Sequence, residues 1–163
     1  MTPDDTTGAG DAGGDLRRDD APVQPQSATP PAITRVNPDT LPDVSATGYS
    51  QISIMAPGRI ACISGQVAWT RDGTPPPGDL AAQMRIVAGN ARHALDAIGA
   101  GPDDIVIARC YVTDLTPERL DALMPPLLEA FDGVKPSLTG IGVAALAAPD
   151  LQVELELTVR LPD

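Results

Sequence analysis

The chain has 163 residues, with 22 acidic side chains against 11 basic ones and a formal net charge of −11. This length fits one domain and a tail. The charge argues against a clustered basic face, which binding to nucleic-acid phosphates or to an anionic membrane surface requires, so we expect neither as a partner. The N-terminus lacks the basic and apolar regions of a leader, and no apolar run approaches the length of a membrane span, so we expect a cytoplasmic protein.

The N-terminal segment, residues 1–31, is rich in Asp, Thr, Gly, Pro and Ser and has almost no large apolar side chains. Such a segment cannot bury enough apolar surface to offset the entropy of ordering, so we predict a disordered tail. Residues 8–13 match the pattern G-x-G-x-x-G, but no strand precedes them and no helix follows, which argues against a dinucleotide-binding loop. The folded domain is predicted to span residues 32–163.

The domain is predicted to begin with a short strand at residues 33–36. After a Pro- and Asp-rich loop, residues 49–55 and 59–66 have the composition of two strands joined at Ala56-Pro57-Gly58, which predicts a hairpin. A further apolar strand is predicted at 104–114. Cys62 and Cys110 both fall in such strands, which fits small buried thiols better than a disulfide.

Two amphipathic helices are predicted between the strands. The first is capped by Asp79 and ended by Gly99 or Gly101. Its inward face, read from a spacing of three or four residues, comprises Leu80, Met84, Val87, Ala91, Leu95 and Ile98. The second opens at Thr116-Pro117 and should kink or restart at Pro125-Pro126. Its inward face comprises Leu120, Leu123, Met124, Leu127 and Phe131.

The C-terminal residues 136–161 resemble two strands joined by a short turn, and the second strand alternates between apolar and polar positions. The apolar positions are Val153, Leu155, Leu157, Val159 and Leu161, and the polar ones are Glu154, Glu156, Thr158 and Arg160. The order β-ββ-α-β-α-ββ predicts an α+β fold in which a mixed sheet carries both helices on one face. The other face would be bare, so we expect a closed homo-oligomer.

Four motifs occur in a fixed order along the chain. They are Tyr49-Ser50-Gln51, Ile63-Ser64-Gly65-Gln66, Tyr111-Val112-Thr113-Asp114-Leu115, and Pro136-Ser137-Leu138-Thr139 leading to Val153-Glu154-Leu155-Glu156. With the helix pattern, this order resembles the RidA/YjgF family, the reactive-intermediate deaminases, over residues 33–161. The resemblance implies a chorismate-mutase-like α+β subunit, a homotrimer with a central barrel, and three ligand clefts between adjacent subunits. The best-known members hydrolyse 2-imino or enamino acids to 2-oxo acids and ammonia without a metal or an organic cofactor, so neither is expected here.

The resemblance also implies the site residues. Glu154 takes the position of the glutamate that holds the attacking water, and it is the expected catalytic residue. The expected ligand-binding residues are Tyr49, Ser64, Gly65, Leu138, Thr139 and Gly140. The arginine that grips the substrate carboxylate in the family falls on Leu138, which offers no hydrogen-bond donor. Arg109 and Arg160 are not expected to replace it, so the usual substrate class is in doubt.

Three functions therefore follow, in decreasing order of expectation. The first is a trimer whose cleft binds a small metabolite and hydrolyses an enamine- or imine-type C–N bond on a substrate not anchored through a carboxylate. The second is a non-catalytic metabolite-binding or regulatory trimer. The third is an ordinary 2-imino-acid deaminase that works despite Leu138. Glu154 and Glu156 as ordinary solvated residues, and Tyr49 as a packing residue, remain open alternatives.

Overall fold

The computed structural model describes residues 31–162, so the predicted tail, apart from Pro31, and the glycine pattern at 8–13 lie outside the described residues. Within this range the elements follow one another along the chain as β1 (Ile33–Val36), β2 (Ile52–Met55), β3 (Ile60–Val67), α1 (Leu80–Ala97), η1 (Pro102–Asp104), β4 (Ile105–Thr113), α2 (Pro117–Ala130), β5 (Ser137–Val143) and β6 (Val153–Arg160). The element η1 is a short 3-10 helix.

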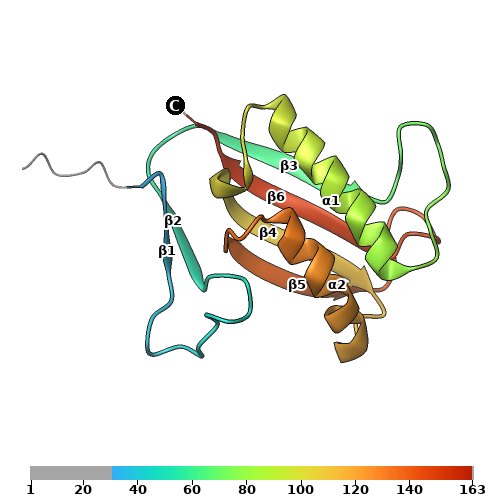
Figure 1. The fold of residues 1–163 in the computed structure, drawn as a ribbon, viewed down its shortest axis with the longest axis horizontal. Coiled ribbons are helices and arrows are strands. Elements are labelled where there is room, and N and C mark those ends of the chain that lie inside the picture. Colours follow the sequence, from blue (N-terminus) through green and yellow to red (C-terminus); the bar gives the residue numbers. More distant parts are fainter. Residues whose placement is uncertain (1–30, 163) are drawn as a thin grey trace, which may run out of the picture.

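A four-stranded mixed sheet in the order β3-β6-β4-β5 forms the body of the domain. β6 runs antiparallel to β3 and to β4, whereas β4 and β5 are parallel and are joined through α2. Both helices lie side by side on one face of this sheet (Figure 1). The predicted α+β fold, a mixed sheet with two helices on one face, is therefore confirmed.

The predicted hairpin between residues 49–55 and 59–66 is wrong. β2 pairs with β1 instead, in a two-stranded ribbon beside the main sheet, while β3 pairs with β6 (Figure 1). Arg160 gives the physical reason, because its guanidinium donates to the carbonyls of Ala56 (3.2 Å) and Pro57 (3.0 Å). The end of β6 thus occupies the turn that would have closed the hairpin. Gly58 permits this approach, since a Cβ there would lie 2.9 Å from Nε of Arg160.

The predicted C-terminal strand pair is also corrected. Both strands exist, but β4 lies between β5 and β6, and residues 144–152 form the connection. A parallel β4–β5 pair needs a crossover, which α2 supplies, and β6 then adds to the free edge of β4 in the opposite direction. The alternation of β6 is confirmed for its apolar side, since Val153, Leu155, Leu157 and Val159 are buried. Arg160, expected on the polar side, is only 5% exposed.

The helices follow the sequence closely. Asp79 caps α1 by accepting a hydrogen bond from the Ala82 amide (2.7 Å), and Thr116 caps α2. The predicted inward residues of α1 are buried except Ile98, which is 38% exposed. α2 runs without a restart through its two internal prolines. Each proline lacks the amide hydrogen that would bond to the carbonyl four residues before it. The two carbonyls concerned belong to exposed positions, where water can hydrogen-bond to them.

The core lies between the helices and the sheet. Its largest fully buried side chains include Met84, Ile105, Leu123, Leu127, Phe131, Leu155 and Leu157. Besides Ile98, two expected core residues differ: Leu120 is 39% exposed, and Cys62 is exposed, whereas Cys110 is buried as predicted. No helix within residues 31–162 is long and apolar enough to cross a bilayer.

Candidate functional site

The sheet face that carries no helix, called here the open face, holds the polar side chains of β6. In the register of the sheet, Glu154 lies opposite Tyr111 and Glu156 lies opposite Arg109. All four side chains are partly exposed, because their neighbours along each strand turn into the core instead. The period-two pattern of β6 therefore creates one acidic stripe on this face.

Gly65 and Glu154 touch on the open face. The register of β3 against β6 shifts between Ile63 and Gln66, which marks a β-bulge at the S-G-Q motif. A Cβ built on Gly65 would overlap the Glu154 carboxylate and lie 2.6 Å from its Cγ. Only glycine leaves room for the carboxylate here. Ser64, beside it, is exposed.

Glu156 belongs to a hydrogen-bonded network that the sequence did not predict. Its Oε1 accepts from Nη1 of Arg109 at 2.9 Å, in an ion pair, and its Oε2 accepts from the Tyr111 hydroxyl at 2.6 Å. This hydrogen bond, with desolvation and the negative charge of Glu156, raises the pKa of Tyr111. Period-two alternation along residues 105–113 could have placed Arg109 and Tyr111 on the face of the glutamates.

Glu154 differs from Glu156 in its contacts. Among residues 31–162, no side chain or backbone group forms a hydrogen bond with the Glu154 carboxylate. Arg109 and Tyr111 are both directed to Glu156 and stabilise its charge. The Glu156 carboxylate is therefore engaged, and the Glu154 carboxylate is available to bind a water or accept a proton.

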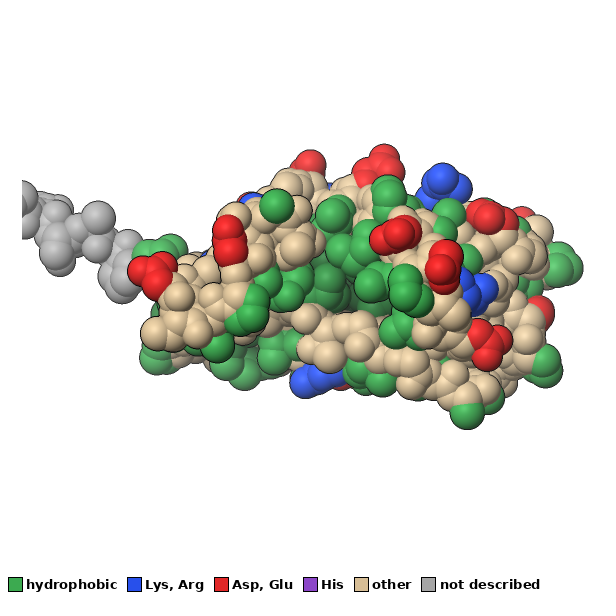
Figure 2. Space-filling view, turned by 90° about the horizontal axis from the view of Figure 1, so that it is seen from below, with side chains coloured by type: hydrophobic (Ala, Val, Ile, Leu, Met, Phe, Trp, Pro, Cys, Tyr) green, Lys and Arg blue, Asp and Glu red, His purple; other side chains and the backbone are tan. Residues whose placement is uncertain are grey.

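A second cluster of predicted residues lines a pocket on the helix side of the sheet. Its volume is about 550 Å³, and it lies between α2, β5 and the loop before β2. Its lining comprises Ala46, Thr47, Tyr49, Leu115, Leu120, Asp121, Met124, Leu128, Leu138 and Gly140. The face seen in Figure 2 shows hydrophobic side chains gathered around a hollow near its middle. Tyr49, Leu138 and Gly140, three of the residues predicted to bind ligand, thus line the same pocket.

The loop that carries Tyr49 is held against β5. The Ser50 amide donates to the Pro136 carbonyl (3.0 Å), and Nζ of Lys135 donates to the Ser45 carbonyl (2.6 Å). Gly48 has a φ of +81°, and a Cβ there would lie 2.8 Å from Cδ1 of Leu128. The left-handed backbone and the close approach both require glycine at this position. The pocket wall is therefore fixed by specific backbone contacts.

The two clusters lie on opposite faces of the sheet. Leu138 and Gly140 pair with Ala108 and Cys110, whose side chains are in the core, whereas Glu154 is on the open face. Thr139 lies on the open face, opposite Arg109. Sequence reasoning placed Leu138 one strand from Glu154, but β4 separates their strands. One subunit alone therefore does not form a cleft that contains both residues.

Metal ligands and reactive thiols are not grouped in this region. Within residues 31–162, no three His, Cys, Asp or Glu side chains lie close enough together to hold a metal ion. Cys110 is 1% exposed, and burial raises the pKa of its thiol to about 12. A thiol in this state is a packing group and a poor nucleophile.

Comparisons with known proteins agree on one family. Residues 41–161 match the family model described as Endoribonuclease L-PSP. The chain is 34% identical over 108 residues to the RutC family protein YjgH of Escherichia coli, covering 65% of this chain and 79% of that protein. Among solved structures, YyfB of Yersinia pestis, a member of the conserved Rid protein family, is 35% identical, with a TM-score of 0.75 and coverage of 80% of this chain and 99% of that one. Rv2704 of Mycobacterium tuberculosis, from the YjgF/YER057c/UK114 family, is 29% identical, with a TM-score of 0.55 and coverage of 79% and 99%.

Proposed function

Because the chain belongs to the RidA/YjgF family, we propose that it forms a homotrimer with a small-molecule cleft between adjacent subunits. In this cleft it hydrolyses an enamine- or imine-type C–N bond on a substrate that is not anchored through a carboxylate. Glu154 is the proposed catalytic residue, and Tyr49, Ser64, Gly65, Leu138, Thr139 and Gly140 are the proposed ligand-binding residues. The observation that carries the proposal is the contact between Gly65 and an unengaged Glu154 carboxylate.

Exposed apolar side chains support an assembly of subunits. Ile52 (40% exposed), Ile54 (56%) and Met55 (37%) lie on β2, and Ile60 (49%) begins β3. Several large apolar groups left exposed within one short segment of the chain mark an interface more often than a solvated surface. In the proposed trimer, the open face of one subunit approaches the Tyr49–Leu138 pocket of the next. Glu154 and Leu138, which one subunit keeps apart, then line the same cleft.

The proposed reaction needs only proton transfers. Glu154 takes a proton from a bound water as the water oxygen bonds to the imine carbon, and it delivers this proton to the nitrogen, giving a carbinolamine. A second transfer through the same carboxylate moves a proton from the hydroxyl to the amino group. The C–N bond then breaks with its electron pair on nitrogen. Imine and water thus become a carbonyl compound and ammonia.

Leu138 is the reason why a 2-imino acid is not the first substrate that we propose. A carboxylate beside it would find no donor from that side chain, and Arg109, the arginine on the open face, is already paired with Glu156. An unpaired buried anion costs several kcal/mol in a desolvated site, roughly 2–5 by analogy with broken buried pairs at interfaces. Substrates without a carboxylate avoid this cost.

The test measures ammonia release by the full-length protein. We expect hydrolysis of a ketimine without a carboxylate, such as acetophenone imine, and near-background hydrolysis of 2-iminobutyrate generated in situ by a dehydratase. Glu154→Gln should lower the rate at least 100-fold, consistent with the usual contribution of an acid–base group of about 10²–10⁴. Glu129→Gln, at an exposed position of α2, is the matched control and should retain the rate.

Two results would change the assignment. Rapid hydrolysis of 2-iminobutyrate that is lost in Glu154→Gln would make the protein an ordinary 2-imino-acid deaminase. Tight binding of a small metabolite without turnover would favour the second candidate, a regulatory trimer. The pocket of about 550 Å³ within one subunit also supports this candidate, because it lacks the Glu154 carboxylate. Light scattering tests the assembly directly, because a trimer has three times the subunit mass of 16.8 kDa.

RNA cleavage, the activity named in the description of the family model, is a weaker candidate. The chain carries a net charge of −11, and of the two glutamates of β6 on the open face only Glu156 forms an ion pair with an arginine, Arg109, among residues 31–162. Phosphate binding requires the opposite balance of charge. We expect a single-stranded RNA to remain intact after incubation with the protein.

A further inference from the structure

We propose that the Tyr49–Leu138 pocket binds an uncharged carbonyl or imine compound with an apolar body, such as an aryl-alkyl ketimine and the ketone that its hydrolysis yields. This inference rests on the proposed function for the reaction. It goes beyond that function by naming the class of molecule that the pocket recognises.

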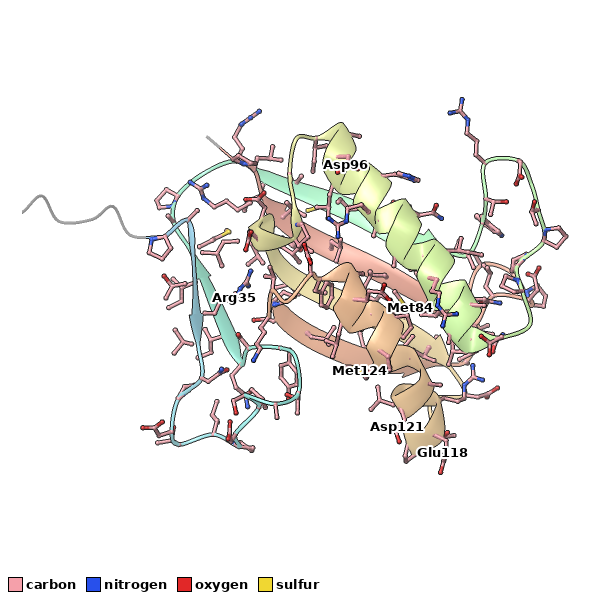
Figure 3. All side chains as sticks on the ribbon, viewed as in Figure 1. Arg35, Met84, Asp96, Glu118, Asp121 and Met124 are labelled. Carbon is pink, nitrogen blue, oxygen red and sulfur yellow. The ribbon has the colours of Figure 1, made fainter. Side chains whose placement is uncertain are left out.

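Most of the lining is aliphatic. Leu115, Leu120, Met124, Leu128 and Leu138 face a space of about 550 Å³, which lies within the range of about 300–1,000 Å³ typical of small-molecule sites. In Figure 3, Asp121 lies near the N-terminal end of α2, and Met124 lies about one turn further along the helix. Burial of an apolar body against such walls contributes about 25 cal/mol for each Å² removed from water.

A smaller cavity of about 40 Å³ lies next to the pocket. The two spaces share Leu115, Leu120, Met124, Leu138 and Gly140 as walls. Methionine adapts its shape more readily than branched residues, so Met124 can move to join the two spaces. The pocket therefore favours a body with a ring or a branch at its end over a short linear one.

The polar groups of the pocket favour an acceptor and disfavour an anion. Asp121 is its one charged lining residue, so a bound carboxylate would meet a like charge and no cation. The Thr47 hydroxyl donates to the Val44 carbonyl (2.7 Å) and is occupied. Within residues 31–162, the Tyr49 hydroxyl makes no hydrogen bond, so it can donate to a carbonyl oxygen or an imine nitrogen. One donor and no cation match a neutral C=O or C=N group.

The test compares two ketones of the same shape by calorimetry on the full-length protein. Phenylacetone and phenylpyruvate share a benzyl ketone body and differ in a methyl group against a carboxylate. We expect phenylacetone to bind at least tenfold more tightly. Because binding of the product ketone needs no turnover, a catalytically inactive protein that shows this preference would contradict the proposed hydrolysis and leave the ligand class supported.

Two variants locate the binding. Gly140→Val should weaken phenylacetone binding at least tenfold, because a Cβ at Gly140 has no neighbour within 4 Å and the larger side chain extends into the pocket. Leu138→Arg should reverse the preference in favour of phenylpyruvate. If Leu138→Arg fails to fold, Leu120→Arg at a 39% exposed position supplies a cation at the same pocket. Equal or tighter binding of phenylpyruvate to the unmodified protein, or phenylacetone binding unchanged in folded Gly140→Val, would overturn the proposal.

Discussion

The replacement Gly65→Ala tests the contact on which the candidate site depends. A methyl group at this position would overlap the Glu154 carboxylate, so either the glutamate turns away or the β3 bulge shifts. Overpacking in a filled core costs about 1–3 kcal/mol. Because the Glu154 side chain is partly exposed and can rotate toward solvent, we expect the lower end, about 1 kcal/mol, and a decrease in Tm of about 4 °C for a domain of this size.

A double-mutant cycle isolates the contact. Thermal unfolding would be followed by circular dichroism for Gly65→Ala, Glu154→Ala and the double variant. Once Glu154 is truncated, the added methyl meets little, so the cost of Gly65→Ala should fall by about 1 kcal/mol, which is the coupling between the two sites. Gly140→Ala serves as the control. It carries the same loss of unfolded-state entropy but adds its Cβ to open space.

If Gly65→Ala costs the same free energy in the Glu154→Ala background as in the unmodified protein, then the glycine is required for its backbone alone and does not make room for the carboxylate. Activity provides a second measurement. Displacing a catalytic group by about 1 Å can cost on the order of 100-fold in rate, so Gly65→Ala should lose far more activity than stability.

Three further predictions concern groups outside the proposed cleft chemistry. Gln83→Leu should lower the free energy of unfolding, measured by urea denaturation, by about 2–4 kcal/mol, because the fully buried amide makes three hydrogen bonds to loop backbones; a change below about 0.5 kcal/mol would contradict this role. In a Cys62→Ser variant, Cys110 should react with a thiol reagent only after unfolding, since burial raises the pKa of its thiol to about 12. In a Tyr49→Phe variant, absorbance at alkaline pH should show Tyr111 ionising above the ordinary pKa of about 10. Since the folded state favours the protonated form of Tyr111, the contribution of this group to stability should be constant below pH of about 10 and fall as the pH rises further.

Local patterns in the sequence predicted the elements well because they depend on neighbouring residues alone. The period of α1, its cap at Asp79 and the alternation of β6 each follow from geometry within one element. Gln83 shows the limit of this reasoning. It is a polar residue that falls between apolar positions of α1, yet it is fully buried, because its amide joins two loops that are distant in sequence.

Pairing between elements could not be predicted from the same signals. A short Pro-Gly turn predicts a hairpin wherever two strand-like runs flank it, but Arg160 binds the turn of residues 56–58 and redirects β3 to β6. The side chain that decides the pairing lies about a hundred residues away along the chain. Likewise, two strands at the end of the chain need not be neighbours, because α2 returns β5 to the parallel edge of β4 before β6 is added.

The position of Leu138 and Glu154 on opposite faces of one sheet gives the proposed activity a dependence on assembly. A single subunit holds a ligand pocket without the carboxylate that would activate water, and an open face with the carboxylate but without the pocket. In the proposed trimer, catalysis then requires two subunits at every site, whereas binding to the pocket requires one. Dilution below the dissociation constant of the trimer should therefore abolish turnover before it abolishes ketone binding. By mass action, dilution separates the subunits that turnover requires, whereas ketone binding to the pocket of one subunit does not depend on their association.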